Sequence, residues 1–553
     1  MIPLVRTQLR SPSFRVLAGI LTSIVLLVVL NLPLSLSAWI PRGEPVHALV
    51  PVAESLLMIW LLLLLLDRRV APGVRRWSTV VAGAVYGVLA GVSAAESFFR
   101  FYYARAFSAR GDIRMIRGAL LLFLGDIGPT VDLIAPVFTV LLFLALAAAG
   151  WAVALAGSAV LRRAKVGPGT LAAVTLLGVA AGAAAGPPSS VAALAVRSWF
   201  EGRPTEFVEV VAADEEEPAD EPEYRFPGLR DRDIYVFVIE AYGYASVYRP
   251  ELARYLDPYR DRLEDVLNEK GYRAVTSYLR APVAGGYSWL AEATFLTGQW
   301  INSQERFLQL YGADLPTLSG TLHEGGYYTL TIRPGTVHGP WPEGWDLYRF
   351  EESIGAHGDG FGFAGPWFSY VPVTDQFAIW TAHQRIEELT RPGGAAADRP
   401  LLVYYQLVSS HTPFNKIPPL VEWEELGDGS VYHERADEIQ RFDNTWTGGT
   451  QLVEGYLASI GYVFDVITDY VERIMDHSRE PIIVIFGDHE PQRPIRSTES
   501  VLSVPIHVAG GDDIVECFVA SGFGAGMRPD QEPPHRLMSD FFPLMVDLAR
   551  NCR

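Results

Sequence analysis

Residues 481–492 read PIIVIFGDHEPQ, and this stretch decides the fold expected for the C-terminal part of the chain. Five apolar residues, 482–486, predict a strand buried on both faces, and this strand runs directly into Gly487, Asp488 and His489. Ligands bind at the carboxyl ends of strands in a parallel sheet. A carboxylate beside an imidazole can bind one divalent metal ion there, although the same pair also occurs in helix caps and surface turns.

The composition indicates a membrane part and a separate acidic part. At 553 residues the chain is too long for one core, and 49% hydrophobic residues with a mean hydropathy of +0.17 are high for a wholly soluble protein. Residues 1–193 carry 16 basic and 7 acidic side chains, a net charge of +9, whereas the remainder carries 29 and 56, a net charge of −27. So acidic a domain is not expected to bind nucleic acid. Two cysteines, Cys517 and Cys552, are too few for a disulfide framework, although they could pair outside the cytoplasm.

Hydropathy predicts a multi-pass membrane domain over residues 1–198, and charge predicts its orientation. Stretches long and apolar enough to span a bilayer lie at residues 14–40, 47–66, 77–98, 131–161 and 170–196. The first is too long for the apolar core of a cleaved signal peptide, so we expect an anchor. The arginine-rich N-terminus and the basic loops at residues 67–76 and 162–165 are expected inside the cell. An acidic linker at residues 199–230 and an extracytoplasmic domain at residues 231–553 would follow.

One loop disagrees with this charge bias. Residues 100–117 carry five arginines, although five spans place them on the outer side. We expect residues 99–128 to lie along the membrane surface as an amphipathic segment whose arginines contact lipid phosphates. A miscounted span is the alternative.

From residue 231 onward the pattern is that of an α/β domain. Apolar, largely β-branched or aromatic runs predict strands at residues 233–240, 272–279, 327–332, 401–409 and 482–486. Helical patterns lie at residues 250–270, 375–390 and 450–476 and around Phe295. Strands that alternate with helices indicate a central, mostly parallel sheet with helices on both faces.

Three of these strands end in side chains of the kind that bind metal ions. One ends at Glu240, another runs out at His411, and the strand at residues 482–486 ends at Asp488 and His489. The carboxyl ends of parallel strands meet at one edge of a sheet. Any one of these residues could cap a helix, but the three strand ends together predict a metal-dependent site.

Residues 281–298, APVAGGYSWLAEATFLTG, supply a nucleophile. Gly285 and Gly286 permit a tight backbone, and Ser288 then begins an apolar, helix-forming run. Ser288 could be an N-cap. A hydroxyl at a helix N-terminus also lies in a field that favours the alkoxide and the phosphate it would attack, and a bound metal would lower its pKa further.

The order and spacing of these residues resemble the lipoteichoic acid synthase branch of the alkaline phosphatase and sulfatase superfamily. That branch contains membrane phosphoglycerol transferases and is close to the phosphoethanolamine transferases. It also has five N-terminal spans and an extracytoplasmic catalytic domain on the bacterial cytoplasmic membrane, so the resemblance covers nearly the whole chain. The matching positions are Glu240, Ser288 with Ala291-Glu292, His411-Thr412-Pro413-Phe414 and Gly487-Asp488-His489.

The resemblance implies a role for each position. Glu240, Asp488 and His489 match metal ligands, and Ser288 matches the nucleophile that also binds the metal. His411 matches a histidine that contacts the transferred group. Oxygen-rich ligation favours Mn²⁺ or Mg²⁺, while the imidazole admits Zn²⁺.

The chain also departs from the family. Its nucleophile is a serine where threonine is usual, which keeps the chemistry. The phosphoglycerol-binding pattern H-x-D-x4-W-x-R is matched at His338 and Trp345, but Pro340 and Leu347 replace its aspartate and arginine. Phosphoglycerol and phosphoethanolamine both remain as the transferred group. A formylglycine sulfatase would need an arginine where Glu292 stands, so it is disfavoured.

These residues predict a phosphotransferase with a membrane phospholipid as donor and an envelope glycan as acceptor. Ser288 would attack the head-group phosphorus, a phosphoserine ester would form and diacylglycerol would leave into the bilayer. His411 and His338 would neutralise nonbridging oxygens or protonate a leaving oxygen, and Trp345 would line the substrate site. Two alternatives remain: a membrane-anchored phosphoester or sulfate-ester hydrolase, and a catalytically silent envelope scaffold of the same fold.

Overall fold

The computed structural model divides the chain into two compact units, Met1–Arg203 and Pro204–Arg553. The described residues are 12–39, 52–64, 70–114, 130–185 without 165 and 167, the positions 191, 193 and 196, and 226–552 without 230, 231, 337–346, 356–359, 369, 446, 447 and 498–500. Apart from residues 226–229, the predicted acidic linker lies outside this set.

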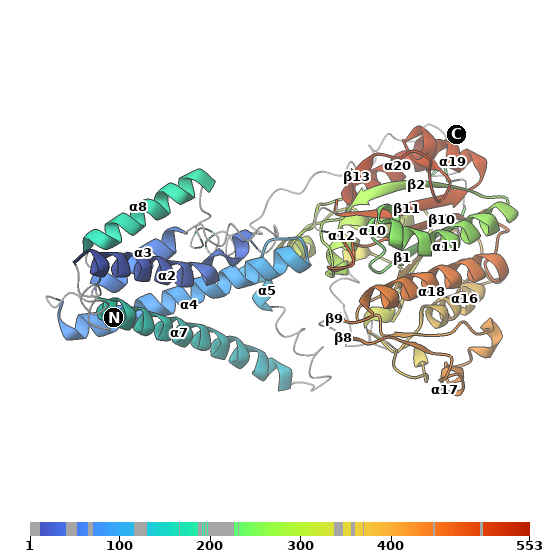
Figure 1. Cartoon of the computed structure of the whole chain (residues 1–553). Helices are drawn as coiled ribbons and strands as arrows, with labels where there is room; N and C mark the ends of the chain where they lie inside the picture. Colours follow the sequence, from blue (N-terminus) through green and yellow to red (C-terminus); the bar gives the residue numbers. More distant parts are fainter. Residues whose placement is uncertain are drawn as a thin grey trace. The chain divides into compact units, whose positions relative to one another are not determined.

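The N-terminal unit consists of helices. They are α2 (Pro12–Trp39), α3 (Ala53–Leu64), α4 (Pro72–Tyr102), α5 (Ala109–Arg114), α7 (Thr130–Ala164) and α8 (Pro168–Ala185) (Figure 1). Each of the five predicted spans contains a helix. Among the described residues, three helical stretches are long and apolar enough to cross a membrane: Ala18–Leu36, Pro72–Tyr102 and Pro136–Leu161. The count of five spans stays a prediction, because α3 and α8 are described over 12 and 18 residues.

Helices α4 and α7 approach closely because glycines face the contact. A Cβ atom at Gly87 would overlap the carbonyl group of Leu146, and one at Gly150 would overlap the carbonyl oxygen of Gly83. Small residues allow this kind of backbone approach between membrane helices. The helices of the N-terminal unit therefore pack against one another as a bundle.

Two arginines of the predicted surface segment form ion pairs at the end of α4 and in the loop that follows it. Arg100 Nε donates to Glu96 Oε1 at 2.6 Å, and Arg105 donates through both terminal nitrogens to Asp112, with Nη1 and Oδ2 at 3.1 Å. Arg105 and Asp112 are both buried. Arg105 is thus paired within the protein instead of facing lipid phosphates, because a buried guanidinium needs an anionic partner. The Arg100 side chain is 37% exposed, so the predicted contact with lipid phosphates stays a prediction for Arg100. Residues 115–128 of the predicted surface segment lie outside the described residues.

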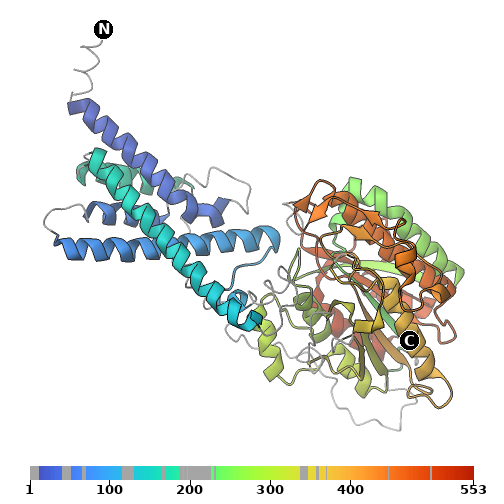
Figure 2. The ribbon, with the colours of Figure 1, turned by 90° about the horizontal axis from the view of Figure 1, so that it is seen from below.

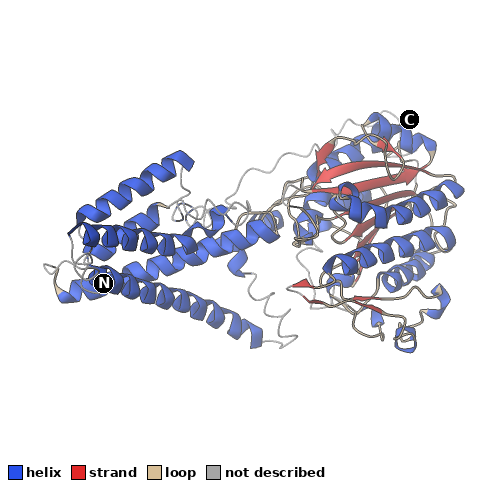
Figure 3. Ribbon diagram, in the orientation of Figure 1, coloured by secondary structure: helices blue, strands red, loops and turns tan. Residues whose placement is uncertain are grey.

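The C-terminal unit is built on one sheet of nine strands (Figure 3). The strand order is β12-β2-β11-β10-β1-β5-β3-β4, and β13 pairs with β2. The strands are β1 (Ile234–Ile239), β2 (Arg273–Arg280), β3 (Tyr328–Ile332), β4 (Glu352–Ile354), β5 (Leu401–Leu407), β10 (Ile482–Gly487), β11 (Ser503–Gly510), β12 (Gly524–Ala525) and β13 (His535–Leu537). The five predicted strands are present as β1, β2, β3, β5 and β10.

The sheet is mixed. Strand β1 pairs in parallel with β5 and β10, and β3 pairs in parallel with β5 and β4. Strand β11 runs antiparallel to both β10 and β2. The sequence predicts no strand there, because Pro505 and His507 interrupt the apolar pattern of β11.

Helices cover both faces of the sheet (Figure 2). One face carries α11 (Pro250–Glu269), α16 (Asp375–Thr390) and α18 (Leu452–Arg473), and the other carries α12 (Ser288–Thr297), α14 (Leu318–Glu324), α19 (Asp512–Ala520) and α20 (Phe541–Asn551). Tyr235 and Phe237 of β1 enter the first core, and Val236 and Val238 enter the second. Because both faces of β1 are buried, the strand is apolar at nearly every position.

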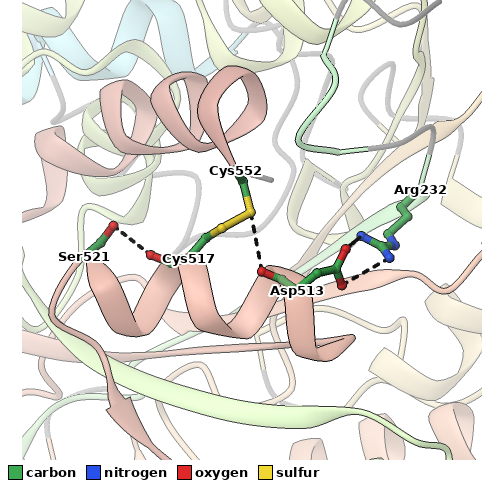
Figure 4. The surroundings of a disulfide bond; sticks show 5 residues. All are labelled: Arg232, Asp513, Cys517, Ser521 and Cys552. Atoms are coloured by element: carbon green, nitrogen blue, oxygen red, sulfur yellow. Dashed lines mark hydrogen bonds and ion pairs between the residues drawn. A yellow bond between two sulfur atoms is a disulfide. The ribbon is translucent and has the colours of Figure 1, made fainter.

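A disulfide bond joins Cys517 of α19 to Cys552, which directly follows α20, with an S–S distance of 2.03 Å (Figure 4). The pairing that the sequence left open is therefore present. In the same region, Arg232 donates to both carboxylate oxygens of Asp513, at 2.8 Å and 3.2 Å. Disulfides persist in oxidising compartments, so this bond agrees with an extracytoplasmic C-terminal unit.

Candidate active site

The carboxyl ends of β5, β1 and β10 lie at one level because the three strands are parallel neighbours. Ile239 of β1 is opposite Leu407 of β5 and Gly487 of β10. The residues that follow on β1 and β10 are Glu240 and Asp488, and both side chains are buried. The shared edge that the sequence predicted is thus formed by adjacent strands.

Glu240, Asp488 and His489 form one cluster. His489 Nε2 lies 3.1 Å from Glu240 Oε1 and 3.5 Å from Asp488 Oδ2. One potential ligand atom from each of the three residues lies within 4.8 Å of the other two. The structure therefore brings together the three side chains that the sequence analysis assigned to a metal ion.

Backbone contacts orient Asp488. Its Oδ1 atom accepts hydrogen bonds from the backbone N–H of Ala241 at 2.8 Å and of His489 at 2.7 Å. These bonds leave Oδ2 as the oxygen nearest to the His489 ring. Gly487 permits the arrangement, since a Cβ atom there would overlap the carbonyl oxygen of Tyr242. Gly487 therefore allows the end of β10 to approach the backbone of Tyr242 closely.

The His489 ring is held by the residue that follows it. Nδ1 lies 3.0 Å from the carbonyl oxygen of Glu490. Because a carbonyl oxygen only accepts, Nδ1 is the nitrogen that carries a proton here. Nε2 consequently faces Glu240 and Ser288, which is the orientation required of a metal-binding imidazole.

Ser288 reaches this cluster from the N-terminus of α12. Its Oγ donates a hydrogen bond to Glu240 Oε2 at 2.8 Å and lies 3.3 Å from His489 Nε2. Ser288 is the first helical residue, and the N-cap position is taken by Tyr287 with a φ of +67°. Gly285 and Gly286 also have positive φ values, 68° and 139°, so the tight backbone expected from the glycines is present. This turn directs the hydroxyl into the cluster.

His411 stands at the edge of the same cluster. Its Nε2 is 3.9 Å from Glu240 Oε1, and its side chain is 19% exposed against 5% for Glu240. The ring of Tyr370 stacks on the imidazole with centroids 3.9 Å apart. His411 is therefore the more accessible group, suitably placed to meet a ligand that enters from solvent.

The two buried carboxylates perturb each other. Burial raises the pKa of Asp488, and the negative charge of Glu240 raises it further. Burial also raises the pKa of Glu240, but His411 and His489 outweigh it and lower that pKa below its ordinary value. Burial lowers the pKa of His489, whereas Asp488 and Glu240 more than offset this and raise it to about 9. Asp488 and His489 therefore hold a proton more strongly than usual, and Glu240 less strongly.

The donor set fits a divalent metal ion. Two carboxylates and one imidazole converge, and a serine hydroxyl lies beside them. Mn²⁺ and Mg²⁺ prefer the oxygen ligands, and Zn²⁺ also takes the nitrogen. A divalent cation would offset the repulsion between the two acids, and metal binding would compete with protons for these atoms.

A buried ion pair between Glu292 and Arg333 supports the helix that begins at Ser288, and the sequence did not predict this pair. Glu292, one turn after Ser288 on α12, accepts from Arg333 Nη2 at 2.7 Å and from Nη1 at 3.1 Å. Both side chains are almost fully buried. Arg333 directly follows β3, so this pair fixes α12 to the sheet edge. Its sequence signal was an arginine directly after an apolar strand, one more polar residue at a strand end.

Two of the predicted substrate residues stay a prediction. His338 and Trp345 lie outside the described residues, and so does Pro340. Leu347, which stands where the family has an arginine, is buried in the core between the sheet and α12. The side chain at that position packs in the core.

No protein-family model matches the sequence, and no curated protein matches it. Solved structures do match. The lipoteichoic acid synthase LtaP from Listeria monocytogenes is 14% identical over 60% of this chain and 74% of its own, with a TM-score of 0.38. A protein of the alkaline phosphatase superfamily from Vibrio parahaemolyticus is 11% identical over 58% and 66%, with a TM-score of 0.36.

A third match is the Streptococcus pyogenes phosphoglycerol transferase GacH in complex with sn-glycerol-1-phosphate, 11% identical over 59% of this chain and 80% of its own, with a TM-score of 0.34. Identities and TM-scores of this size carry no conclusion about activity, which has to come from the site.

Proposed function

We propose that this protein transfers a phospho head group from a membrane phospholipid to a hydroxyl group of an envelope glycan, through a phosphoserine at Ser288. The observation that carries the proposal is the 2.8 Å hydrogen bond from the Ser288 hydroxyl to Glu240, inside the cluster with Asp488 and His489. A hydroxyl that donates to a buried carboxylate has a proton acceptor already in place. Glu240, Asp488 and His489 are the residues that would hold the metal ion.

In the first half-reaction Ser288 Oγ attacks the phosphorus of the phospholipid. Its proton moves along the existing hydrogen bond to Glu240 Oε2, an Oγ–P bond forms, and the bond from phosphorus to the diacylglycerol oxygen breaks. His411, at the more exposed edge, stabilises the nonbridging oxygens and protonates the departing alkoxide. A divalent cation, when bound, supplies charge that stabilises the phosphoryl oxygens and lowers the pKa of the serine hydroxyl.

The second half-reaction reverses these roles. A glycan hydroxyl attacks the phosphoserine phosphorus, its proton passes to His411, and Ser288 Oγ leaves and regains its proton from Glu240. The head group thereby moves from lipid to glycan with no net change in charge on the protein. Phosphoglycerol and phosphoethanolamine are both compatible with these steps.

Membrane attachment supports the choice of donor. At least three helices of the N-terminal unit can cross a bilayer, so the catalytic unit stays tethered where phospholipids are concentrated. We propose a five-span protein of the bacterial cytoplasmic membrane with the C-terminal unit outside. The charge bias of the loops and the Cys517–Cys552 bond support this orientation.

Mass spectrometry of the peptide that contains Ser288 tests the proposal. The full-length protein is incubated with phosphatidylglycerol or phosphatidylethanolamine vesicles and with Mn²⁺, Mg²⁺ or Zn²⁺ in turn. We expect the mass of one phospho head group on this peptide, none in Ser288→Ala and a retained adduct in Ser288→Thr, because threonine offers the same hydroxyl. An unmodified wild-type peptide under all conditions contradicts the proposal. In a second incubation with an envelope glycan added, release of the free head group without glycan modification indicates a hydrolase.

A further inference from the structure

The position of His411 depends on contacts from outside its own strand. Residues 408–411 follow β5, and hydrogen bonds hold their backbone from two sides. Asp375, the first residue of α16, accepts from the backbone N–H of Val408 at 2.8 Å and of Ser409 at 3.1 Å. Ser410 Oγ donates to the backbone carbonyl of Glu240 at 2.7 Å. The backbone before His411 is thus tied both to α16 and to the strand end that carries a proposed metal ligand.

Only the side-chain torsions of His411 remain to be set. One ring nitrogen, Nδ1, lies 2.7 Å from the carbonyl oxygen of Thr412, and Nε2 points toward Glu240 at 3.9 Å. The Tyr370 ring lies nearly flat on the imidazole, with 3.9 Å between centroids and 15° between planes. Tyr370 comes from the segment just before α16, so the same part of the chain supplies both the backbone grip and the stacked ring.

We infer that Tyr370 is a positioning residue for the proposed transfer reaction: its aromatic face holds the His411 imidazole with Nε2 toward the phosphoryl group at Ser288. A flat ring at van der Waals distance blocks rotation of the imidazole out of its plane. The function depends on a planar face, and the phenolic hydroxyl is not needed for it. This inference rests on the proposed function.

The matched variants are Tyr370→Phe, which keeps the planar face, and Tyr370→Met, which keeps much of the volume without it. Phe377→Met is the control: Phe377 is a buried aromatic residue of α16 that packs edge-to-face against Phe363 and makes no contact with His411 that the structure describes. In a single-turnover assay of Ser288 labelling, Tyr370→Met should slow the reaction about 10- to 100-fold, with an apparent dissociation constant for the phospholipid within about twofold of wild type. Tyr370→Phe should retain the wild-type rate, and Phe377→Met should lose thermal stability without this slowing.

A second measurement needs neither substrate nor metal. Modification of His411 by diethyl pyrocarbonate, followed on its peptide by mass spectrometry, should be several-fold faster in Tyr370→Met than in wild type, Tyr370→Phe or Phe377→Met, because the stacked ring shields one imidazole face. Equal modification rates in all four proteins overturn the inference, and so does equal slowing of labelling by Tyr370→Met and Phe377→Met. Should Tyr370→Met not fold, Tyr370→Leu provides the same comparison.

The two measurements separate this inference from the proposed function. A wild-type protein that forms no Ser288 adduct defeats the transfer reaction and with it the positioning role. A wild-type protein that is labelled, while Tyr370→Met is labelled equally fast, leaves the transfer reaction in place and defeats the positioning role alone.

Discussion

Strand β1 has a buried acidic residue at each end, and the two acids have different charged neighbours. At the amino end, Asp233 accepts from the backbone N–H of Leu401 at 2.8 Å and lies 3.6 Å from Arg479. Its neighbour Arg232 pairs with Asp513 and with Glu480. At the carboxyl end, Glu240 lies beside a second acid, Asp488, and among the described residues their only cationic partners are histidines.

The difference separates a structural end from a reactive end. Arginine keeps its charge at any physiological pH, so the acids at the amino end always have a charged partner from the chain itself. Histidine can lose its charge, and an imidazole without its proton is a metal ligand. Two buried carboxylates that face imidazoles therefore offer a place for an external cation, while acids that face arginines do not.

Substitutions of Glu240 and Asp488, the acids at the carboxyl end, should have the largest effect. If these variants behaved like variants at the amino end, the distinction between the two ends would be wrong. We expect Glu240→Gln and Asp488→Asn each to weaken binding of Mn²⁺ by at least about 100-fold and to abolish Ser288 labelling. In excess chelator the thermal unfolding of Asp488→Asn should be unchanged or shifted upward, since one of two like charges is gone. Glu240→Gln should unfold at a lower temperature, because the histidines that lower the pKa of Glu240 lose their anionic partner. Titration calorimetry and thermal unfolding measure the two effects.

The control for these variants is Arg232→Gln at the amino end. It should lower thermal stability, because Asp513 loses its buried partner, and should leave Mn²⁺ affinity at the wild-type value. Wild-type metal affinity in Glu240→Gln, or reduced affinity in Arg232→Gln, would remove the distinction between the two ends.

Removal of the disulfide bond tests the structural end without changing the reactive end. Cys517 and Cys552 are 35 residues apart in sequence, so breaking the bond should lower the free energy of unfolding of the C-terminal unit by about 3 kcal/mol. We expect the double variant Cys517→Ser/Cys552→Ser to show this loss in chemical denaturation while Ser288 labelling keeps its rate at low temperature. Loss of labelling in a fully folded double variant contradicts the assignment.

The smallest expected effect is the pH dependence contributed by Asp233. Burial raises its pKa to about 6, above the unfolded value of 3.8. Between these values the folded protein keeps a proton that the unfolded chain has lost, so this group lowers stability as pH rises from about 4 to 6. Asp233→Asn should remove about 2 kcal/mol of that decline. Denaturation at pH 4, 5, 6 and 7 measures it, and an unchanged profile in the variant argues against the shift.

Much of the site could be predicted because each part carries a local signal. Apolar runs that end in Glu240 and Asp488 predicted both the strands and their polar ends, and strand parallelism then implied a shared edge. The glycines before Ser288 predicted a tight turn that is followed by the start of a helix. These signals are short in range, which is why a single sequence shows them.

Other features depended on partners far away in the chain. Strand β11 was missed because only its antiparallel neighbours, β10 and β2, make its mixed composition a strand. Arg105 was expected to face lipid phosphates, but it is buried and pairs with Asp112. Tyr370, Asp375 and Arg333 gave no pattern that would tie them to His411 or to α12. Each of these contacts exists only once distant segments are packed together.

The amino-acid sequence by itself determined the division into an apolar membrane part and an acidic α/β part, the strands of the sheet centre and the identity of the residues at their ends, since hydropathy and periodicity are properties of neighbouring residues. Tertiary structure alone decided the 2.8 Å contact between Ser288 and Glu240, the Cys517–Cys552 bond and the ring of Tyr370 on His411. Distances between groups that are tens or hundreds of residues apart are set by packing of the whole unit, which no local pattern encodes.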